Sequence, residues 1–213
     1  MTTIRAFILP LVFLAAAQGA QDAGALLAPG AGELGWRPLI DSLAAKGTVL
    51  APFTEHRFFP FRRDPVALTG ILRYSPERGL SLQYVNPEPS VLIADTSGLL
   101  LRDRQGRSRE LPSESREAGA IASLLSIMRF DLAALYPRFI IHAFRTESGW
   151  GFRFTPRDPE VARSLGEITV EGSGSQVRHL EFKMSSSQRV EIDVGENRSG
   201  TPFAPAELRQ FFR

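Results

Sequence analysis

Glu55 and Arg57 are the first side chains whose types and spacing could do chemistry. They are two residues apart in a segment of alternating polarity, so in a strand they would lie on one face. A carboxylate and a guanidinium in that arrangement form either a solvated ion pair or a polar anchor that faces a cavity. The spacing alone leaves both interpretations open.

The three histidines, His56, His142 and His179, are the remaining candidates for catalysis or metal binding. No two of them share an element at ligand spacing, whereas metal sites draw their ligands in close pairs. The chain contains no H-E-x-x-H, G-x-S-x-G, P-loop, kinase or deaminase motif. We therefore expect no enzyme, no metal site and no cofactor. A hydrolase that used Glu55, His56 or His142 would need those side chains to converge in one cleft.

Composition narrows the classes of partner. The 213 residues include 25 basic and 23 acidic side chains, so the net charge of +2 implies no nucleic-acid partner. The absence of Cys removes disulfides, thiol catalysis and Cys-ligated zinc, and also the cysteine that a bacterial lipoprotein needs for lipidation. The 15 Phe make a large apolar core available.

The beginning of the chain has the pattern of a targeting signal. Arg5 precedes an uncharged apolar run over residues 6–17, which is shorter than the ~20 residues of a membrane-spanning helix. Small residues follow it, as at a cleavage site, and residues 1–20 are therefore interpreted as a secretory signal peptide. Residues 21–35, rich in Gly, Ala and Pro, are expected to be a flexible lead-in, and residues 36–213 a single domain.

The pattern of the domain is mainly β. Residues 36–44 have a helical apolar stripe, and alternation with a period of two then dominates. Helices are predicted at 115–129, 131–136 and 205–212, and strands at 53–61, 67–74, 80–85, 90–94, 98–102, 108–111, 138–145, 149–154, 167–171, 177–184 and 188–194. So many antiparallel strands rarely stay flat, so we expect an α+β fold with a curved sheet that forms an incomplete β-barrel. Whether side chains fill it or leave an apolar pocket is open at this point.

A run of motifs resembles the periplasmic outer-membrane lipoprotein carrier family, the LolA-like proteins. Residues 70–95 have the family's order of a Gly-started strand, a Pro turn, an apolar strand, a second Pro turn and a strand that ends in Asp. The matching positions are Gly70, Pro76, Leu80, Leu82, Pro87, Ser90, Val91, Ile93 and Asp95. The Phe53-x-Glu55 strand, the helices at 118–128 and 132–136, and the strand end at 152–156 are similar to further family segments.

The resemblance implies a curved sheet with a helical lid that encloses an acyl-chain cavity. A monomeric periplasmic carrier would then shuttle lipoproteins or related lipids toward the outer membrane, through brief membrane contact, an inner-membrane exporter and an outer-membrane acceptor. The alternative is a periplasmic lipid-sensing regulatory module without a transport role. The cavity residues expected on this basis are Phe58, Leu68, Leu72, Leu82, Tyr84, Ile93, Leu101, Ile121, Leu125, Met128, Phe139, Ile141, Phe152 and Phe154.

One departure from the family concerns the closing of the lid. The family's carriers place an Arg directly before the Pro of the first turn, where it holds the lid through backbone hydrogen bonds. Here that position is Ser75, and Arg78 follows Pro76 by two residues. The resemblance therefore implies a divergent branch with a different closing contact or a more open cavity.

Overall fold

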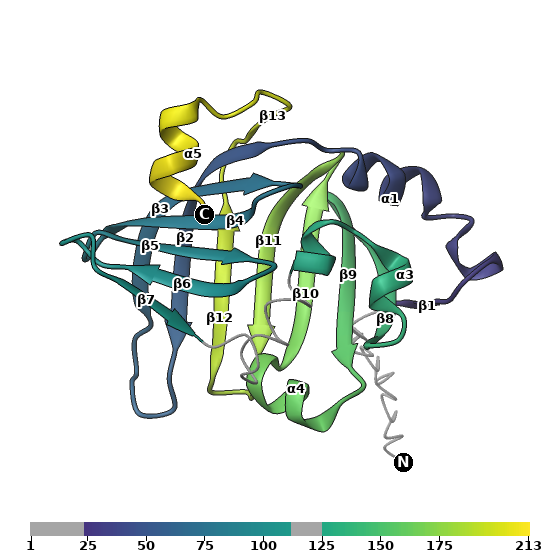
Figure 1. The fold of residues 1–213 in the computed structure, drawn as a ribbon. Helices are drawn as coiled ribbons and strands as arrows, with labels where there is room; N and C mark the ends of the chain where they lie inside the picture. Colours follow the sequence, from purple (N-terminus) through teal and green to yellow (C-terminus); the bar gives the residue numbers. More distant parts are fainter. Residues whose placement is uncertain (1–23, 112–124) are drawn as a thin grey trace, which may run out of the picture.

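The computed structural model describes residues 24–111 and 125–213, and Figure 1 shows the resulting fold. One antiparallel sheet of 13 strands has the order β1-β8-β9-β10-β11-β12-β2-β3-β4-β5-β6-β7, with the short β13 paired to β2. The strands are β1 (Ala25–Leu27), β2 (Val49–Phe58), β3 (Val66–Ser75), β4 (Gly79–Asn86), β5 (Ser90–Asp95), β6 (Gly98–Arg102), β7 (Ser108–Leu111), β8 (Phe139–Thr146), β9 (Gly149–Pro156), β10 (Glu167–Ser173), β11 (Gln176–Lys183), β12 (Arg189–Val194) and β13 (Arg198–Ser199).

The sheet curls rather than lying flat, so that β3–β7 cross the direction of β9–β12 in Figure 1. The helices are few and short: η1 (Ala31–Glu33), α1 (Arg37–Ala44), α3 (Leu132–Leu135), α4 (Pro159–Leu165) and α5 (Pro205–Phe211), with a further helical turn at residues 125–128. This open, curved antiparallel sheet confirms the predicted mainly β fold. None of the helices within the described ranges is long and apolar enough to cross a membrane.

The fold differs from the sequence prediction in a few segments. Ala25–Leu27, inside the expected flexible lead-in at 21–35, forms β1 and pairs with β8. Helix α4 was not predicted, although Asp158 caps it by accepting a hydrogen bond of 2.7 Å from the Glu160 amide and Gly166 ends it at φ 68°. The predicted signal at 1–20, and most of the predicted helix at 115–129, lie outside the described residues.

One part of the concave face, which we call the aromatic half, is built from β8–β10. Its inward side chains include Phe139, Trp150, Phe152 and Phe154, each at most 2% exposed. The rings meet edge to face or tilted, with centroids 5.4 Å apart for Trp150 and Phe152 and 6.0 Å for Phe139 and Phe154. Trp36, at the start of α1, adds its ring 5.5 Å from Phe152. This half of the sheet is a packed core.

The other part, which we call the leucine half, is the concave face of β3–β6. Leu72 pairs with Leu82, Leu82 with Leu92, and Leu92 with Leu101, so four leucines cross neighbouring strands in one row. Leu72 and Leu82 are buried, Leu92 is partly buried, and Leu101 is 44% exposed. Burial therefore decreases toward the sheet edge.

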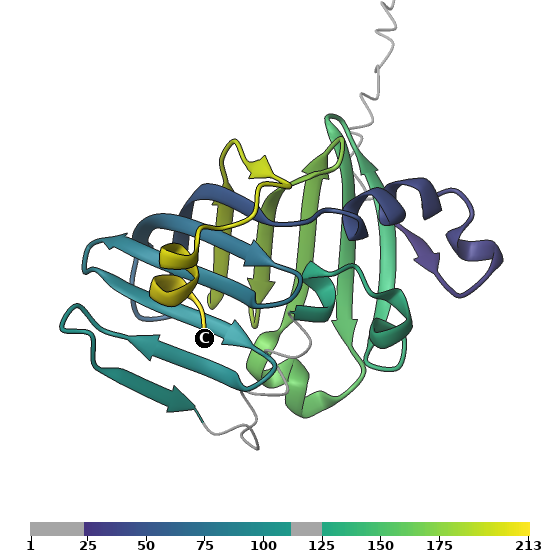
Figure 2. The same cartoon turned by 45° about the horizontal axis from the view of Figure 1, so that its top comes forward.

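The convex face of the same strands carries a second, smaller core under α5. Ile93, Leu100, Phe211 and Phe212 are buried there, and we call them the convex cluster. The Arg73 guanidinium lies 3.6 Å from the centroid of the Phe211 ring, which places α5 on the face opposite to Leu72. Figure 2 shows α5 over β3 and β4, and residues 125–135 in front of β9 and β10.

Candidate functional site

An apolar cavity lies where the two halves meet, at the end of the sheet at which β2 and β11 begin and β3 and β12 end. Its free volume is about 50 Å³, and it is lined by Leu43, Lys46, Val49, Leu72, Tyr74, Met128, Phe130, Ser175, Val177, Leu180, Val194 and Asn197. A water molecule needs roughly 10–15 Å³ of such volume, so this space holds only a few small groups in the present conformation.

Helix α1 and the β10–β11 pair position part of the wall of this cavity. Helix α1 buries Ile40 and Leu43, and it ends at Ala44 so that Lys46 and then Val49 follow at the rim. The register between β10 and β11 shifts at Glu171/Gly172, and this irregularity brings both Val177 and Leu180 to the cavity although they are three residues apart.

Residues 125–130, which we call the lid segment, close the cavity with Met128 and Phe130. Phe130 has a φ of 51°, in the left-handed region that bulky residues rarely adopt. Its ring nevertheless is buried, with centroids 6.2 Å from Trp150 and 5.9 Å from Phe152. Packing into the aromatic half therefore offsets the backbone strain and anchors one end of the lid segment.

Arg129 fastens the lid segment to the other half. Its Nη2 donates a hydrogen bond of 3.0 Å to the carbonyl oxygen of Pro76, in the turn between β3 and β4. It also forms a hydrogen bond with the Tyr74 side chain, where burial raises the tyrosine pKa and the arginine lowers it less strongly. The lid segment thus spans from the aromatic half to the leucine half.

This contact lies beside Ser75, where the sequence departs from the LolA-like pattern. The arginine comes from the lid segment and the accepting carbonyl from the β3–β4 turn. Arg78 serves elsewhere, since its Nη1 donates to the backbone oxygen of Arg213 at 2.9 Å.

Glu55, Arg57 and Tyr84 form a polar cluster on the concave face. Glu55 is 3% exposed, and it accepts hydrogen bonds from Arg57 Nε and, at 2.7 Å, from the Tyr84 hydroxyl. Burial, followed by the charge of Glu55, raises the pKa of Tyr84. Glu55 and Arg57 therefore form an inward polar anchor rather than a solvated surface pair, and both carboxylate oxygens of Glu55 accept a hydrogen bond.

The hydrolase hypothesis is contradicted by this arrangement. His56 alternates with Glu55 along β2, so it points to the opposite face, and His142 lies on β8 with four strands between it and β2. The residues do not converge in a cleft. Within the described ranges no group of His, Asp or Glu could hold a metal ion.

The predicted cavity residues fall into distinct places. Leu72 and Met128 line the cavity. Eight others belong to the surrounding core or pack against it: Leu68, Leu82, Tyr84, Leu125, Phe139, Ile141, Phe152 and Phe154. Leu101 lies at the exposed end of the leucine row, and Ile121 is outside the described residues.

Two of the predicted residues are on the wrong face. Ile93 alternates with Leu92 along β5 and lies in the convex cluster. Phe58 alternates with Arg57 at the end of β2, and its ring lies 3.6 Å from the Arg189 guanidinium. In these two strands the residues that face inward are the immediate neighbours, Leu92 and Arg57. Because side chains alternate along a strand, an error of one residue in the assumed phase assigns every side chain to the opposite face.

Lys46, Val177, Leu180 and Asn197 line the cavity but were not predicted. Val177 and Leu180 belong to β11, which was predicted as a strand, whereas Lys46 precedes β2 and Asn197 follows β12. The pairing of β2 with β12 brings these last two connections together. The available signal was the position of Lys46, one of two lysines in the chain, directly after an amphipathic helix.

Comparisons with known proteins give structural matches only. No family model matches the sequence, and no curated protein does. An uncharacterized conserved protein from Thermus thermophilus matches with a TM-score of 0.48 and 9% identity over 82% of this chain and 93% of that one. The MucA/MucB complex of Pseudomonas aeruginosa matches with 0.47 and 12% over 81% and 58%, and a LolA superfamily protein from Nitrosomonas europaea with 0.42 and 8% over 81% and 96%.

The LolA superfamily, which the sequence motifs resemble, is thus also present among the structural matches.

Proposed function

We propose that this protein is a periplasmic carrier that binds the acyl chains of lipoproteins or related lipids on its concave face and shuttles them toward the outer membrane. The observation that carries the proposal is the apolar cavity closed by the lid segment, which Arg129 fastens to the carbonyl of Pro76. The predicted signal peptide at residues 1–20 supports the periplasmic location.

The energetics of acyl chains favour such a design. Each methylene removed from water contributes about 0.8 kcal/mol, so a chain of a dozen or more methylenes needs a dry surface to travel through water. The leucine half offers that surface, since its row runs from the cavity at Leu72 to the partly exposed Leu101.

Loading requires the lid segment to move. The present volume of about 50 Å³ is too small for an acyl chain, and Met128 and Phe130 of the lid segment form part of its wall. Each of the two hydrogen bonds of Arg129, to the Pro76 carbonyl and to Tyr74, is worth roughly 1–3 kcal/mol, which the binding of several methylenes can offset.

The test measures whether the protein retains a bound lipid through purification and how fast it exchanges a bound acyl ligand. Protein made in a bacterial periplasm should release a lipid on organic extraction and show its mass in native spectra, and the purified protein should bind a fluorescent fatty acid. Arg129→Ala should speed ligand exchange several-fold, whereas Arg62→Ala, an exposed residue in the β2–β3 connection, should not. A clean apo spectrum together with no binding of the fluorescent acid overturns the proposal.

A transfer assay separates the carrier from the lipid-sensing module. A carrier moves labelled lipoprotein or lipid from donor to acceptor vesicles at a rate that rises with protein concentration. A sensing module binds the same lipid but leaves that rate unchanged.

A further inference from the structure

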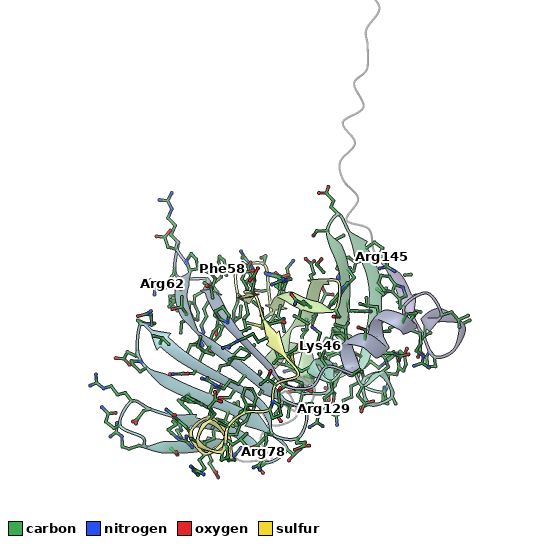
Figure 3. The ribbon with its side chains drawn as sticks, turned by 90° about the horizontal axis from the view of Figure 1, so that it is seen from above. Lys46, Phe58, Arg62, Arg78, Arg129 and Arg145 are labelled. Atoms are coloured by element: carbon green, nitrogen blue, oxygen red, sulfur yellow. The ribbon has the colours of Figure 1, made fainter. Side chains whose placement is uncertain are left out.

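Lys46 is a cation at the rim of an otherwise apolar cavity. The lining contains eight aliphatic or aromatic residues besides Tyr74, and its other polar members are Lys46, Ser175 and Asn197. No carboxylate is among the residues that line it in the described part of the chain. Figure 3 looks onto this end of the molecule and labels Lys46 beside the end of α1.

The charge of Lys46 has no counter-ion among residues 24–111 and 125–213, where no Asp or Glu lies within salt-bridge distance of it. Burial lowers the pKa of Lys46, and the nearby Arg178 guanidinium lowers it further by repulsion. Arg178 is held in place through a hydrogen bond of 3.0 Å from its Nη1 to the carbonyl of Gly195. Two cations therefore approach each other where an anion would stabilise both.

The neighbouring polar group is also incomplete. The Asn197 side-chain oxygen is buried and has no hydrogen-bond partner within the described residues. Because this oxygen only accepts hydrogen bonds, an anion cannot satisfy it, and Asn197 can serve an anionic ligand only through the N–H groups of its side-chain amide nitrogen. The acids on the surrounding elements do not serve Lys46: Asp193 of β12 pairs with His179 at 2.8 Å, and Glu196 is exposed.

On the basis of the proposed function, we infer that the preferred ligand is a single acyl chain that ends in an anionic group, with the chain in the cavity and the anion on Lys46. The apolar wall accepts the methylenes and excludes water, which strengthens the ion pair at the rim. A carboxylate and a phosphate monoester or diester share this chemistry, so a fatty acid and a lysophospholipid are both members of the class.

Binding measurements with matched head groups test the inference. Palmitate is compared with hexadecanol, and palmitoyl lysophosphatidylglycerol with the uncharged monopalmitoylglycerol, by competition against a fluorescent acyl probe. We expect each anionic ligand to bind about tenfold or more tightly than its uncharged counterpart. If only the first comparison shows the difference, the site takes carboxylates, and if only the second, it takes phosphates.

Lys46→Met keeps an apolar stem and removes the charge, so it should abolish the preference by weakening palmitate binding far more than hexadecanol binding. Lys183→Met removes the chain's other lysine, which is exposed, and should preserve the preference. Lys46→Arg should preserve most of it. Equal affinities within both ligand pairs would overturn the inference but leave the carrier function standing, whereas failure of every acyl ligand to bind would overturn the carrier function itself.

The two lysines also allow a direct readout without a variant. Acetylation of Lys46, measured by mass spectrometry relative to Lys183, should slow several-fold when palmitate is present and much less with hexadecanol. Equal protection by both ligands would show that chain burial alone shields Lys46 and would contradict an ion pair.

Discussion

The two halves of the concave face are built from the same kind of strand but are filled differently. The aromatic half packs Phe139, Phe152 and Phe154 to at most 1% exposure beneath α1 and the lid segment. The leucine half uses flexible aliphatic side chains and ends in the half-exposed Leu101. Rigid rings that interlock edge to face resist rearrangement, whereas leucines can change rotamer around a guest. The difference separates a scaffold from a surface that can accept a ligand, and the cavity lies on their boundary.

Phe152→Ala is expected to give the largest effect. The ring is 1% exposed and contacts Trp36, Phe130, Trp150 and Phe154, so its loss should reduce the free energy of unfolding by about 3–5 kcal/mol in urea titration. The partly buried Leu92→Ala, in the leucine half, should cost only about 1 kcal/mol. Equal losses for the two variants would mean that both halves are scaffold.

Glu55→Ala should have the next largest effect, because it leaves Arg57 and the Tyr84 hydroxyl without their acceptor. Since Arg57 retains 39% side-chain exposure and can be solvated, we expect a loss of about 1–3 kcal/mol rather than the full cost of breaking a buried pair. Glu55→Gln, which can still accept from Tyr84, should lose less. Chemical denaturation of the three proteins measures the order, and a neutral Glu55→Ala would show that water replaces the carboxylate.

Alkaline titration of the tyrosines should compare the solvent exposure of the two parts of the molecule. The chain has three tyrosines, and burial raises the pKa of Tyr74 and Tyr84 on the leucine side and of Tyr136 beside α3. Because folding raises these pKa values, their contribution to stability is fully present below about pH 10 and is lost as the pH rises above it. Ultraviolet absorbance should show little tyrosinate until the protein unfolds. Early ionisation of one tyrosine, identified with Phe variants, would mark its half as open to solvent.

Leu101→Ala should produce the smallest effect on stability, about 0.5 kcal/mol or less, because the side chain is already 44% exposed. If the leucine half receives the acyl chain, the same variant should weaken binding of a fluorescent fatty acid by several-fold, since each lost methylene contact is worth about 0.8 kcal/mol. An unchanged affinity would confine the ligand to the cavity proper.

The local sequence pattern was sufficient to predict where most strands lie, but not which strands pair with each other. The spacing of turn residues such as Pro76, Pro87 and Gly98 located β3–β6, because each hairpin is closed by nearby residues. The pairing of β1 with β8 and of β12 with β2 joins distant segments, and nothing in the short Ala25–Leu27 run indicates its partner. Since the cavity forms where β2, β3, β11 and β12 meet, its location depended on the part of the topology that local sequence does not encode.

The same limit explains which site residues were found. Leu72 lies in a strand of clean alternation, and Met128 on a helical stripe, so both could be assigned an inward face. Val177 reaches the cavity only through the irregular register at Glu171/Gly172, which no periodicity predicts. Asn197 is a loop residue, and the burial of its side-chain oxygen without a partner among the described residues is a property of three-dimensional packing.

The convex cluster has a consequence for how the chain is made. Arg213, which follows α5, binds Asp95 with N–O distances of 2.8 and 2.9 Å across 118 residues of sequence. Strands β3–β6 therefore emerge during synthesis and pair long before the residues that cover Ile93 and Leu100 exist. Until then their outer face is an uncovered apolar patch, a surface through which nascent chains associate. A chain cleaved before α5 would keep that patch permanently, so proteolysis near Pro205 would leave a fold that self-associates.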